Sequence, residues 1–158
     1  MKIRFWGTRG SIPVSLTTQD IRQKLLSTLQ AANGRTFADE AEMARFIAGL
    51  GFEVSGTFGG HTSCVQLIPE GPEQDNLDLC SGVLALGQHK QARHGPGQPQ
   101  TNQVFLSHLH WDHIMGFPFF GPAFNPNATI VIHSGHADAE TALRRQQEEI
   151  SFPVPFDW

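Results

Sequence analysis

The sequence is poor in charged residues and has no long apolar run. Charged side chains make up 16% of its 158 residues, below the roughly 25% of a typical soluble domain. Glycine and proline number 16 and 10, whereas a solvated coiled coil has many charges and few helix breakers. No stretch approaches about 18 consecutive apolar residues, so the sequence predicts no membrane span. The composition favours a globular domain rich in loops.

The sequence also lacks a basic tract and has few cysteines. The net charge is −4 and the sequence has no basic tract, so composition gives no support for a protein that coats nucleic acid. The two cysteines, Cys64 and Cys80, do not make a disulfide framework. We expect both to be reduced, buried thiols in a cytoplasmic protein. The opening segment MKIRFWGTRG becomes polar and glycine-rich too early for a signal peptide, which agrees with that location.

The periodicity of apolar residues predicts a mixed α/β arrangement within one domain of ordinary size, residues 1–158. Strands are expected at 2–6, 64–68, 77–80, 102–107 and 129–133, a loop at 69–76, and helices at 81–95 and 136–150. Strands come first and then alternate with helices, an order that favours a mixed sheet with helices on one face.

Two further amphipathic segments, 18–32 and 38–50, predict a helical hairpin. Thr17 and Asp20 have the spacing of a capping box at the start of the first helix. The hairpin interrupts the strand pattern, so we expect a helical insertion at about 18–52 that serves as a lid or as a dimer contact.

Five of the eight histidines fall between residues 108 and 136, and three of them lie in SHLHWDH (107–113). At an extended strand end, residues two apart point to the same side, so His108 and His110 can bind one metal ion together. Asp112 and His113 follow about one turn later and can reach a second ion. Imidazole and carboxylate ligands suit zinc, and also iron or manganese. Four such groups are costly to desolvate unpaired, which favours a metal site over a ligand-free loop.

This segment matches the His-x-His-x-Asp-His motif of the metallo-β-lactamase fold. Three other segments resemble the same superfamily: MKIRFWGTRGSIPV (1–14), GGHTSCV (59–65) and LDLCSG (77–82). FLSHLHWDHIMGFPFF (105–120) is similar to the ribonuclease Z and cyclic-phosphodiesterase branch. The resemblance covers about residues 1–14 and 56–158. It implies an α/β (α+β) fold, the N-terminal half of a four-layer αββα sandwich, in which a mixed β-sheet carries outer helices and the hairpin is an insertion.

The resemblance also implies the roles of the motif residues. His108 and His110 would bind the first of two divalent metal ions, zinc with manganese or iron as alternatives. Asp112 and His113 would bind the second ion. A metal-bridged hydroxide would be the nucleophile, and Asp112 would orient it as base.

Residues outside the motif have weaker assignments. Asp78 resembles an aspartate that holds the motif loop by hydrogen bonds, with an ordinary turn carboxylate as the alternative. His61 lies in a glycine-rich loop that the resemblance brings near the site, and a surface histidine is its alternative. Cys80 replaces a glycine and is expected to be a small buried side chain rather than a soft metal ligand. Arg144 and Arg145 are expected to be solvated.

The aromatic residues around the motif are Trp111, Phe117, Phe119 and Phe120. We expect them to pack the motif loop rather than to stack on a base.

The implied function is a metal-dependent hydrolase of a phosphodiester, cyclic or nucleotide-type. A non-catalytic half-domain that needs a partner is the first alternative, and an RNA-processing nuclease, which would need a basic arm, is the second. The chain ends at Trp158, before the third histidine, the bridging aspartate and the final histidine of the family. We therefore expect a fragment of a longer enzyme or a half-domain.

One sheet face would then lack cover, and we expect it to form a homodimer or to bind the missing C-terminal half. The residues expected to supply this face in some alternation are Val65, Leu67, Leu77, Leu79, Val104, Leu106, Ile130 and Ile132. No membrane partner is expected.

Overall fold

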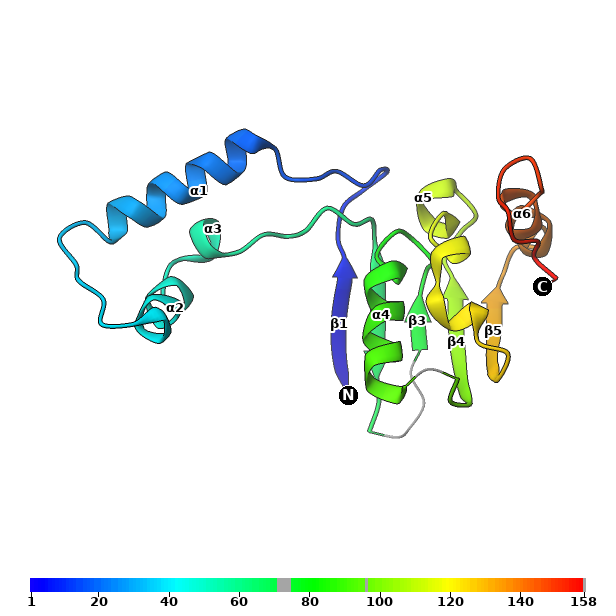
Figure 1. Cartoon of the computed structure of the whole chain (residues 1–158). Coiled ribbons are helices and arrows are strands. Elements are labelled where there is room, and N and C mark those ends of the chain that lie inside the picture. The colour runs from blue at the N-terminus through cyan, green and yellow to red at the C-terminus, as the bar shows by residue number, and fades with distance from the viewer. Residues whose placement is uncertain (71–74, 96, 158) are drawn as a thin grey trace. The chain divides into compact units, whose positions relative to one another are not determined.

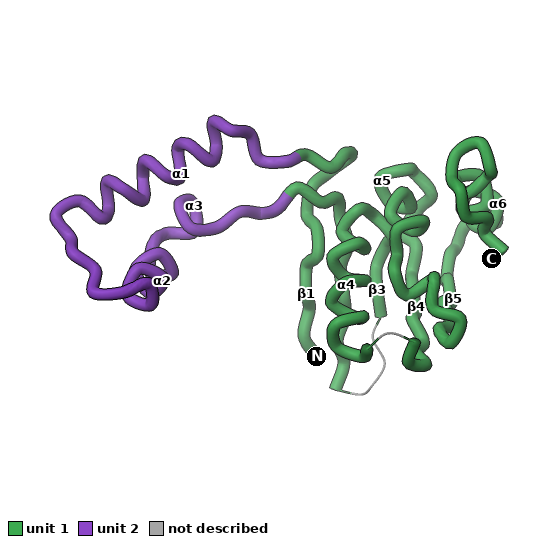
Figure 2. Tube along the Cα trace, viewed as in Figure 1, with its two compact units in different colours: residues 1–14, 60–158 green, residues 15–59 purple. Residues whose placement is uncertain are grey.

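The computed structural model describes residues 1–70, 75–95 and 97–157. The chain divides into two compact units, one of residues 1–14 and 60–158 and one of residues 15–59 (Figure 2). Among the described residues, none of the helices combines the length and apolar character that crossing a membrane requires.

A five-stranded mixed sheet forms the centre of the larger unit (Figure 1). Its strands lie in chain order: β1 (Lys2–Gly7), β2 (Cys64–Ile68), β3 (Asp75–Leu77), β4 (Gln100–Leu106) and β5 (Ala128–Ser134). The first three strands pair antiparallel, and β3, β4 and β5 pair parallel. Parallel neighbours need crossover connections, and helices lie in both of these connections. The predicted mixed sheet is confirmed.

The third strand is displaced from its prediction at 77–80. It ends at Leu77, and Asp78 takes a positive φ of 62°. This left-handed conformation is tolerated by aspartate better than by most residues, and it turns the chain out of the sheet. Part of the loop predicted at 69–76 lies outside the described residues.

Helices cover one face of the sheet. The helix α4 (Val83–His94) and the 3-10 helices η1 (Phe117–Phe119) and η2 (Gly121–Phe124) lie on this face (Figure 1). The short helix α5 (Trp111–Ile114) follows β4, and α6 (Ala139–Gln146) follows β5 and is shorter than predicted. The main core lies between the helices and the sheet, and its buried members are Cys64, Leu79, Val83, Leu86, Val104, Leu106, Ile114, Phe117, Phe120 and Leu143.

The opposite face of the sheet presents a row of apolar side chains across its strands. Register aligns Phe5 with Val65, Val65 with Leu77, Leu77 with Phe105, and Phe105 with His133. Phe5 remains 65% exposed and Phe105 40% exposed. The neighbouring row on the same face consists of Ile3, Leu67, Asp75, Gln103 and Val131. We call the two rows together the open face.

The membership of the open face differs from the prediction. Val65, Leu67 and Leu77 lie on it as expected. The prediction is wrong for the other five residues: Val104, Leu106 and Leu79 are buried in the core, and Ile130 and Ile132 pack against that core. Side chains alternate between faces along each strand, so β4 turns Phe105 to the open face and its two apolar neighbours to the core.

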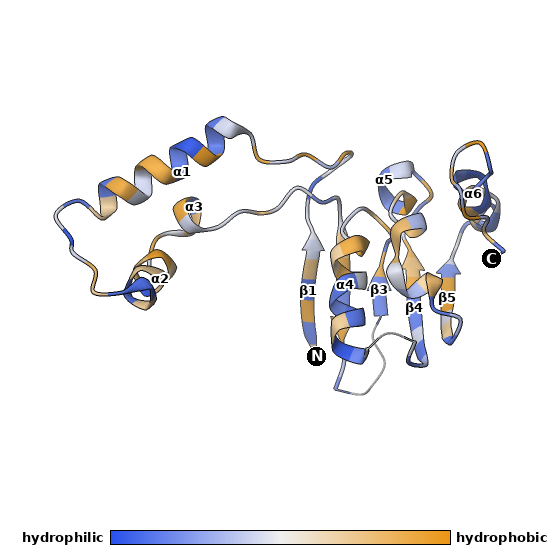
Figure 3. Cartoon of the chain, in the orientation of Figure 1, coloured by the Kyte–Doolittle hydropathy of each residue, from blue (hydrophilic) through white to orange (hydrophobic). Residues whose placement is uncertain are grey.

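The smaller unit contains α1 (Thr18–Ala31), α2 (Glu40–Ala48) and α3 (Phe52–Ser55). The predicted capping box is present, since the Asp20 amide donates to Thr17 Oγ1 at 3.2 Å and the Thr17 amide donates to Asp20 Oδ2 at 2.9 Å. Apolar residues recur along α1 (Figure 3), yet neither α1 nor α2 contains a buried residue.

A lysine joins two helices of this unit. Lys24 on α1 donates to the carbonyl oxygens of Glu53 at 2.7 Å and Gly56 at 2.5 Å. These carbonyls lie at the end of α3, where the helix dipole favours a positive charge. The rings of Phe37 and Phe46 also pack 5.2 Å apart.

The core of the larger unit contains a buried amine. Lys90 on α4 is 3% exposed, and its Nζ donates to Asn102 Oδ1 on β4 at 2.8 Å. Burial lowers the pKa of Lys90 to about 8, and the nearby Cys64 raises this pKa by a smaller amount. The folded chain therefore releases this proton at a lower pH than the unfolded chain does.

Replacing Lys90 with methionine should remove one component of the pH dependence of stability. Between about pH 8 and 10.4 the unfolded chain binds a proton at Lys90 that the folded chain has released, so raising the pH favours folding there. From about pH 7 to about pH 9.5, the unfolding free energy of the wild type should rise by about 2 kcal/mol relative to Lys90→Met. Urea titrations across this range measure the difference.

Both proteins carry Cys64 and Cys80, so thiol ionisation cancels from this comparison. Lys2→Met, which changes an exposed lysine, should leave the wild-type pH profile in place. Parallel profiles for the wild type and Lys90→Met would contradict the prediction.

Candidate metal centre

The histidine motif lies at the end of β4, where the chain leaves the sheet and enters α5. The α5 turn is fixed by backbone hydrogen bonds: the Leu79 amide donates to the His113 carbonyl at 2.8 Å, and the Gly116 amide donates to the Leu79 carbonyl at 2.7 Å. A side chain at position 116 would collide with the Cys80 carbonyl oxygen. Glycine therefore lets the motif pack against the segment that follows β3.

Three motif side chains converge. Ligand atoms of His108, Asp112 and His113 all lie within 4.8 Å of one another, and all three residues are half-buried. His113 Nε2 lies 3.4 Å from Asp112 Oδ2, and the rings of His108 and His113 are 3.7 Å apart between centroids. Two imidazoles and a carboxylate suit a divalent transition metal, so these residues fit one such ion.

The Asp78 carboxylate lies behind this group and contacts it directly. Its Oδ1 accepts from the Ser107 amide at 2.8 Å, and its Oδ2 lies 2.8 Å from His113 Nδ1. Ser107 Oγ lies 2.9 Å from both carboxylate oxygens. Because a carboxylate accepts the Nδ1 proton, Nε2 of His113 is left free to bind a metal. Ser107 was not singled out from the sequence, because its role depends on Asp78, 29 residues away.

His110 and His61 stand apart from the three converging residues. His110 is exposed, and its ring lies 4.8 Å from that of His108 between centroids. His61 Nδ1 lies 3.3 Å from Ser81 Oγ. Neither histidine belongs to a potential metal-binding group found among the described residues. Their assignments to the site stay predictions.

Cys80 belongs to a second group of potential ligands, with Asp78 and His113. The Asp78 oxygens are already used by Ser107 and His113. Burial, followed by the nearby charge of Asp78, raises the pKa of the Cys80 thiol well above its usual range. The arrangement therefore favours a neutral, buried thiol. Both cysteines are free and buried, as predicted.

The remaining histidines after the motif lie near β4. His133 stacks on Phe105 with centroids 4.4 Å apart, and its Nε2 lies 2.7 Å from Gln103 Oε1. His136 Nε2 lies 3.3 Å from the Ser107 carbonyl oxygen. The His136 side chain thus contacts the backbone of Ser107, the first residue of the motif loop.

Residues 82–158 match the family model of the metallo-beta-lactamase superfamily. The match includes the whole motif and covers just under half of the chain. No curated protein and no solved structure matches the chain. The superfamily match indicates a metal-dependent hydrolase in general, and the five-stranded mixed sheet with its helices is consistent with a partial metallo-β-lactamase sandwich.

Asp78→Asn should weaken metal binding about 10- to 100-fold, the usual effect of losing a group that orients a histidine ligand. Asparagine tolerates the positive φ at this position, but it has one acceptor oxygen and cannot accept from both the Ser107 amide and His113 Nδ1, as the two Asp78 oxygens do. Competition between the protein and a chelating dye for Zn²⁺ measures the affinity, and circular dichroism checks the fold.

Asp138→Asn is the matched control, since Asp138 is exposed and its side chain makes no capping hydrogen bond. Unchanged zinc affinity in a folded Asp78→Asn protein would exclude the orienting role.

Proposed function

We propose that this protein is a metal-dependent hydrolase of the metallo-β-lactamase superfamily that cleaves phosphodiesters, cyclic or nucleotide-type. The observation that carries the proposal is the convergence of His108, Asp112 and His113 at the end of β4. The preference for phosphodiesters rests on the resemblance of residues 1–14 and 105–120 to the phosphodiesterase branch.

We assign metal-binding and water-orienting roles to the motif residues. His108 and His110 would hold one divalent ion, and Asp112 and His113 a second; the closeness of His108 to Asp112 and His113 supports neighbouring ions. Zinc fits this donor set, with manganese and iron as alternatives. Such ions supply Lewis acidity and an activated water. Asp112 would orient the attacking water, while Asp78 keeps the His113 ring in its binding orientation.

A non-catalytic half-domain is the second candidate, because His110 lies outside the converging group. Metal content separates the two candidates: a complete centre retains close to two ions per chain on dialysis, and an incomplete one loses metal. An RNA-processing nuclease is less favoured, because the net charge of −4 offers little attraction to a phosphate backbone.

The purified chain loaded with Zn²⁺ should hydrolyse bis(p-nitrophenyl) phosphate, with release of nitrophenolate measured by absorbance. His108→Ala and Asp112→Asn should each lower kcat at least about 100-fold, because each removes a metal ligand or the water-orienting group. Chelation should abolish the activity and Zn²⁺ should restore it.

The control is His94→Ala, which changes an exposed histidine at the end of α4 and should keep wild-type activity. Hydrolysis that survives chelation, or that His108→Ala does not reduce, would refute the metal-dependent mechanism.

We also propose that the open face packs against a second sheet, supplied by another copy of the chain or by the other half of the sandwich. Phe5, Ile3 and Phe105 are 65%, 54% and 40% exposed on it. Soluble monomers seldom expose a contiguous apolar patch of more than about 600 Å². Phe5, Leu77 and Phe105 belong to one row of apolar residues across the neighbouring strands β1 to β4, which suits packing against another sheet.

The double variant Phe5→Glu/Phe105→Glu should be monomeric where the wild type is dimeric, because it introduces charges into the apolar contact. Sedimentation velocity distinguishes the 17.4 kDa chain from its dimer. Leu84→Glu, which changes an exposed leucine on α4, should leave the dimer intact. A wild-type chain that is monomeric at all tested concentrations would contradict self-association.

Two further assignments belong to this proposal. The chain is one metallo-β-lactamase-like domain with a helical insertion at about 18–52, and the compactness of residues 15–59 as a separate unit supports this. The location is cytoplasmic, which two free thiols support.

A further inference from the structure

A cavity of about 440 Å³ lies beside the motif, between α5, η1 and α6. Aromatic rings of Trp111, Phe119 and Phe152 line it, together with Met115 and the guanidinium of Arg145. Its volume falls within the range of small-molecule sites. The cavity combines flat apolar walls with one cationic donor group.

The aromatic residues around the motif separate into two pairs. Phe117 and Phe120 are buried in the core at 9% and 0% exposure. Trp111 and Phe119 are 72% and 57% exposed, so these two do not enter the core as Phe117 and Phe120 do. Phe119 is held edge-on by Phe152, with centroids 5.5 Å apart.

The two arginines of α6 differ in their ion pairs. Arg144 pairs with Glu140 at 2.9 Å and with Asp157 at 2.6 Å. Arg145 lines the cavity, and within the described residues it has no ion pair or hydrogen bond through its side chain. An unpaired guanidinium presents five donors in a plane, which match the acceptors of a flat ligand.

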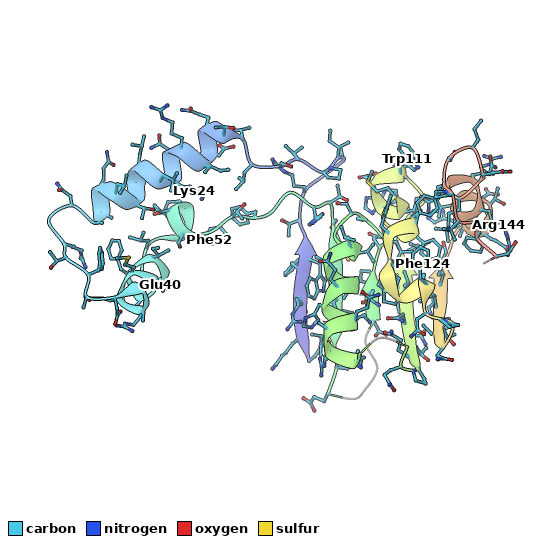
Figure 4. The ribbon with its side chains drawn as sticks, viewed as in Figure 1. Lys24, Glu40, Phe52, Trp111, Phe124 and Arg144 are labelled. Carbon is cyan, nitrogen blue, oxygen red and sulfur yellow. The ribbon has the colours of Figure 1, made fainter. Side chains whose placement is uncertain are left out.

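The cavity is tied to the motif. Trp111 stands between His110 and Asp112 in the sequence and lies at the start of α5 (Figure 4). Gln146 of α6 donates from Nε2 to the Ile114 carbonyl at 3.1 Å, which joins the α6 wall to α5. A group bound in this cavity is therefore held next to the residues that would bind the metal.

We propose that this cavity binds the nucleobase of the substrate, which rests on the proposed phosphodiester hydrolysis. The base stacks on Trp111 and Phe119, since stacking on aromatic side chains accepts any flat heterocycle. Arg145 donates to acceptors on the edge of the base, as arginine does to O6 and N7 of guanine. The scissile phosphate then extends toward His108 and Asp112.

Binding of guanosine 5′-monophosphate and of ribose 5-phosphate, which lacks the base, tests the proposal. Calorimetry on the full chain in the presence of chelator removes the metal contribution from both ligands. The nucleotide should bind at least about tenfold more tightly than the sugar phosphate. Trp111→Ala should weaken nucleotide binding roughly 5- to 100-fold, Phe119→Ala should also weaken it, and Trp111→Phe, which keeps a stacking face, should retain most of it.

The arginine pair supplies a matched control. Arg145→Gln should weaken nucleotide binding, and Arg144→Gln, on the same helix, should not. Equal affinity for the two ligands, or no effect of Trp111→Ala and Arg145→Gln, would overturn the base-binding cavity even in a chain that hydrolyses phosphodiesters. A base preference that these variants remove, in a chain without hydrolysis, would support the cavity and overturn only the proposed activity.

Discussion

The hydrogen bonds of one carboxylate hold the candidate metal centre together. Asp78 binds the Ser107 amide and hydroxyl, at the start of the motif, and His113 Nδ1, at its end. The residue departs from β3 with a positive φ, and this turn directs its side chain at the loop that follows the parallel neighbour β4. Backbone hydrogen bonds fix the α5 turn itself, and the Asp78 carboxylate adds the contacts that orient the His113 ring and hold the Ser107 end of the motif.

The sheet that carries this link has two unlike faces. One face is sealed by α4 and the 3-10 segment over buried residues such as Val104 and Phe120. The other presents Phe5, Leu77 and Phe105 to solvent. The candidate metal centre lies at the end of β4, so its residues come from a turn and the short helix α5 and not from either face of the sheet. The motif and the exposed apolar residues of the open face therefore lie on different parts of the sheet.

A cavity lies beside the motif and shares Trp111 with it. Trp111 interrupts the ligands in sequence and turns to a cavity that Arg145 also lines. On the core side of the same loop, Phe117 is buried. The local sequence thus contains candidate metal ligands, core residues and cavity residues close together. Aromatic residue type alone does not predict which of these side chains are buried, since Trp111 is exposed and Phe117 is buried.

The sequence by itself determined the features that depend on neighbours along the chain. These include the mixed α/β order, the capping box of Thr17 and Asp20, and a cluster of three histidines and an aspartate within seven consecutive residues. Only the tertiary structure decided which of the motif's four ligand candidates converge and that Ser107 contacts Asp78. Those outcomes depend on strand register and on the turn at Asp78, which bring together residues about 30 positions apart. Residue spacing encodes local periodicity, whereas such contacts are set by the packing of the whole unit.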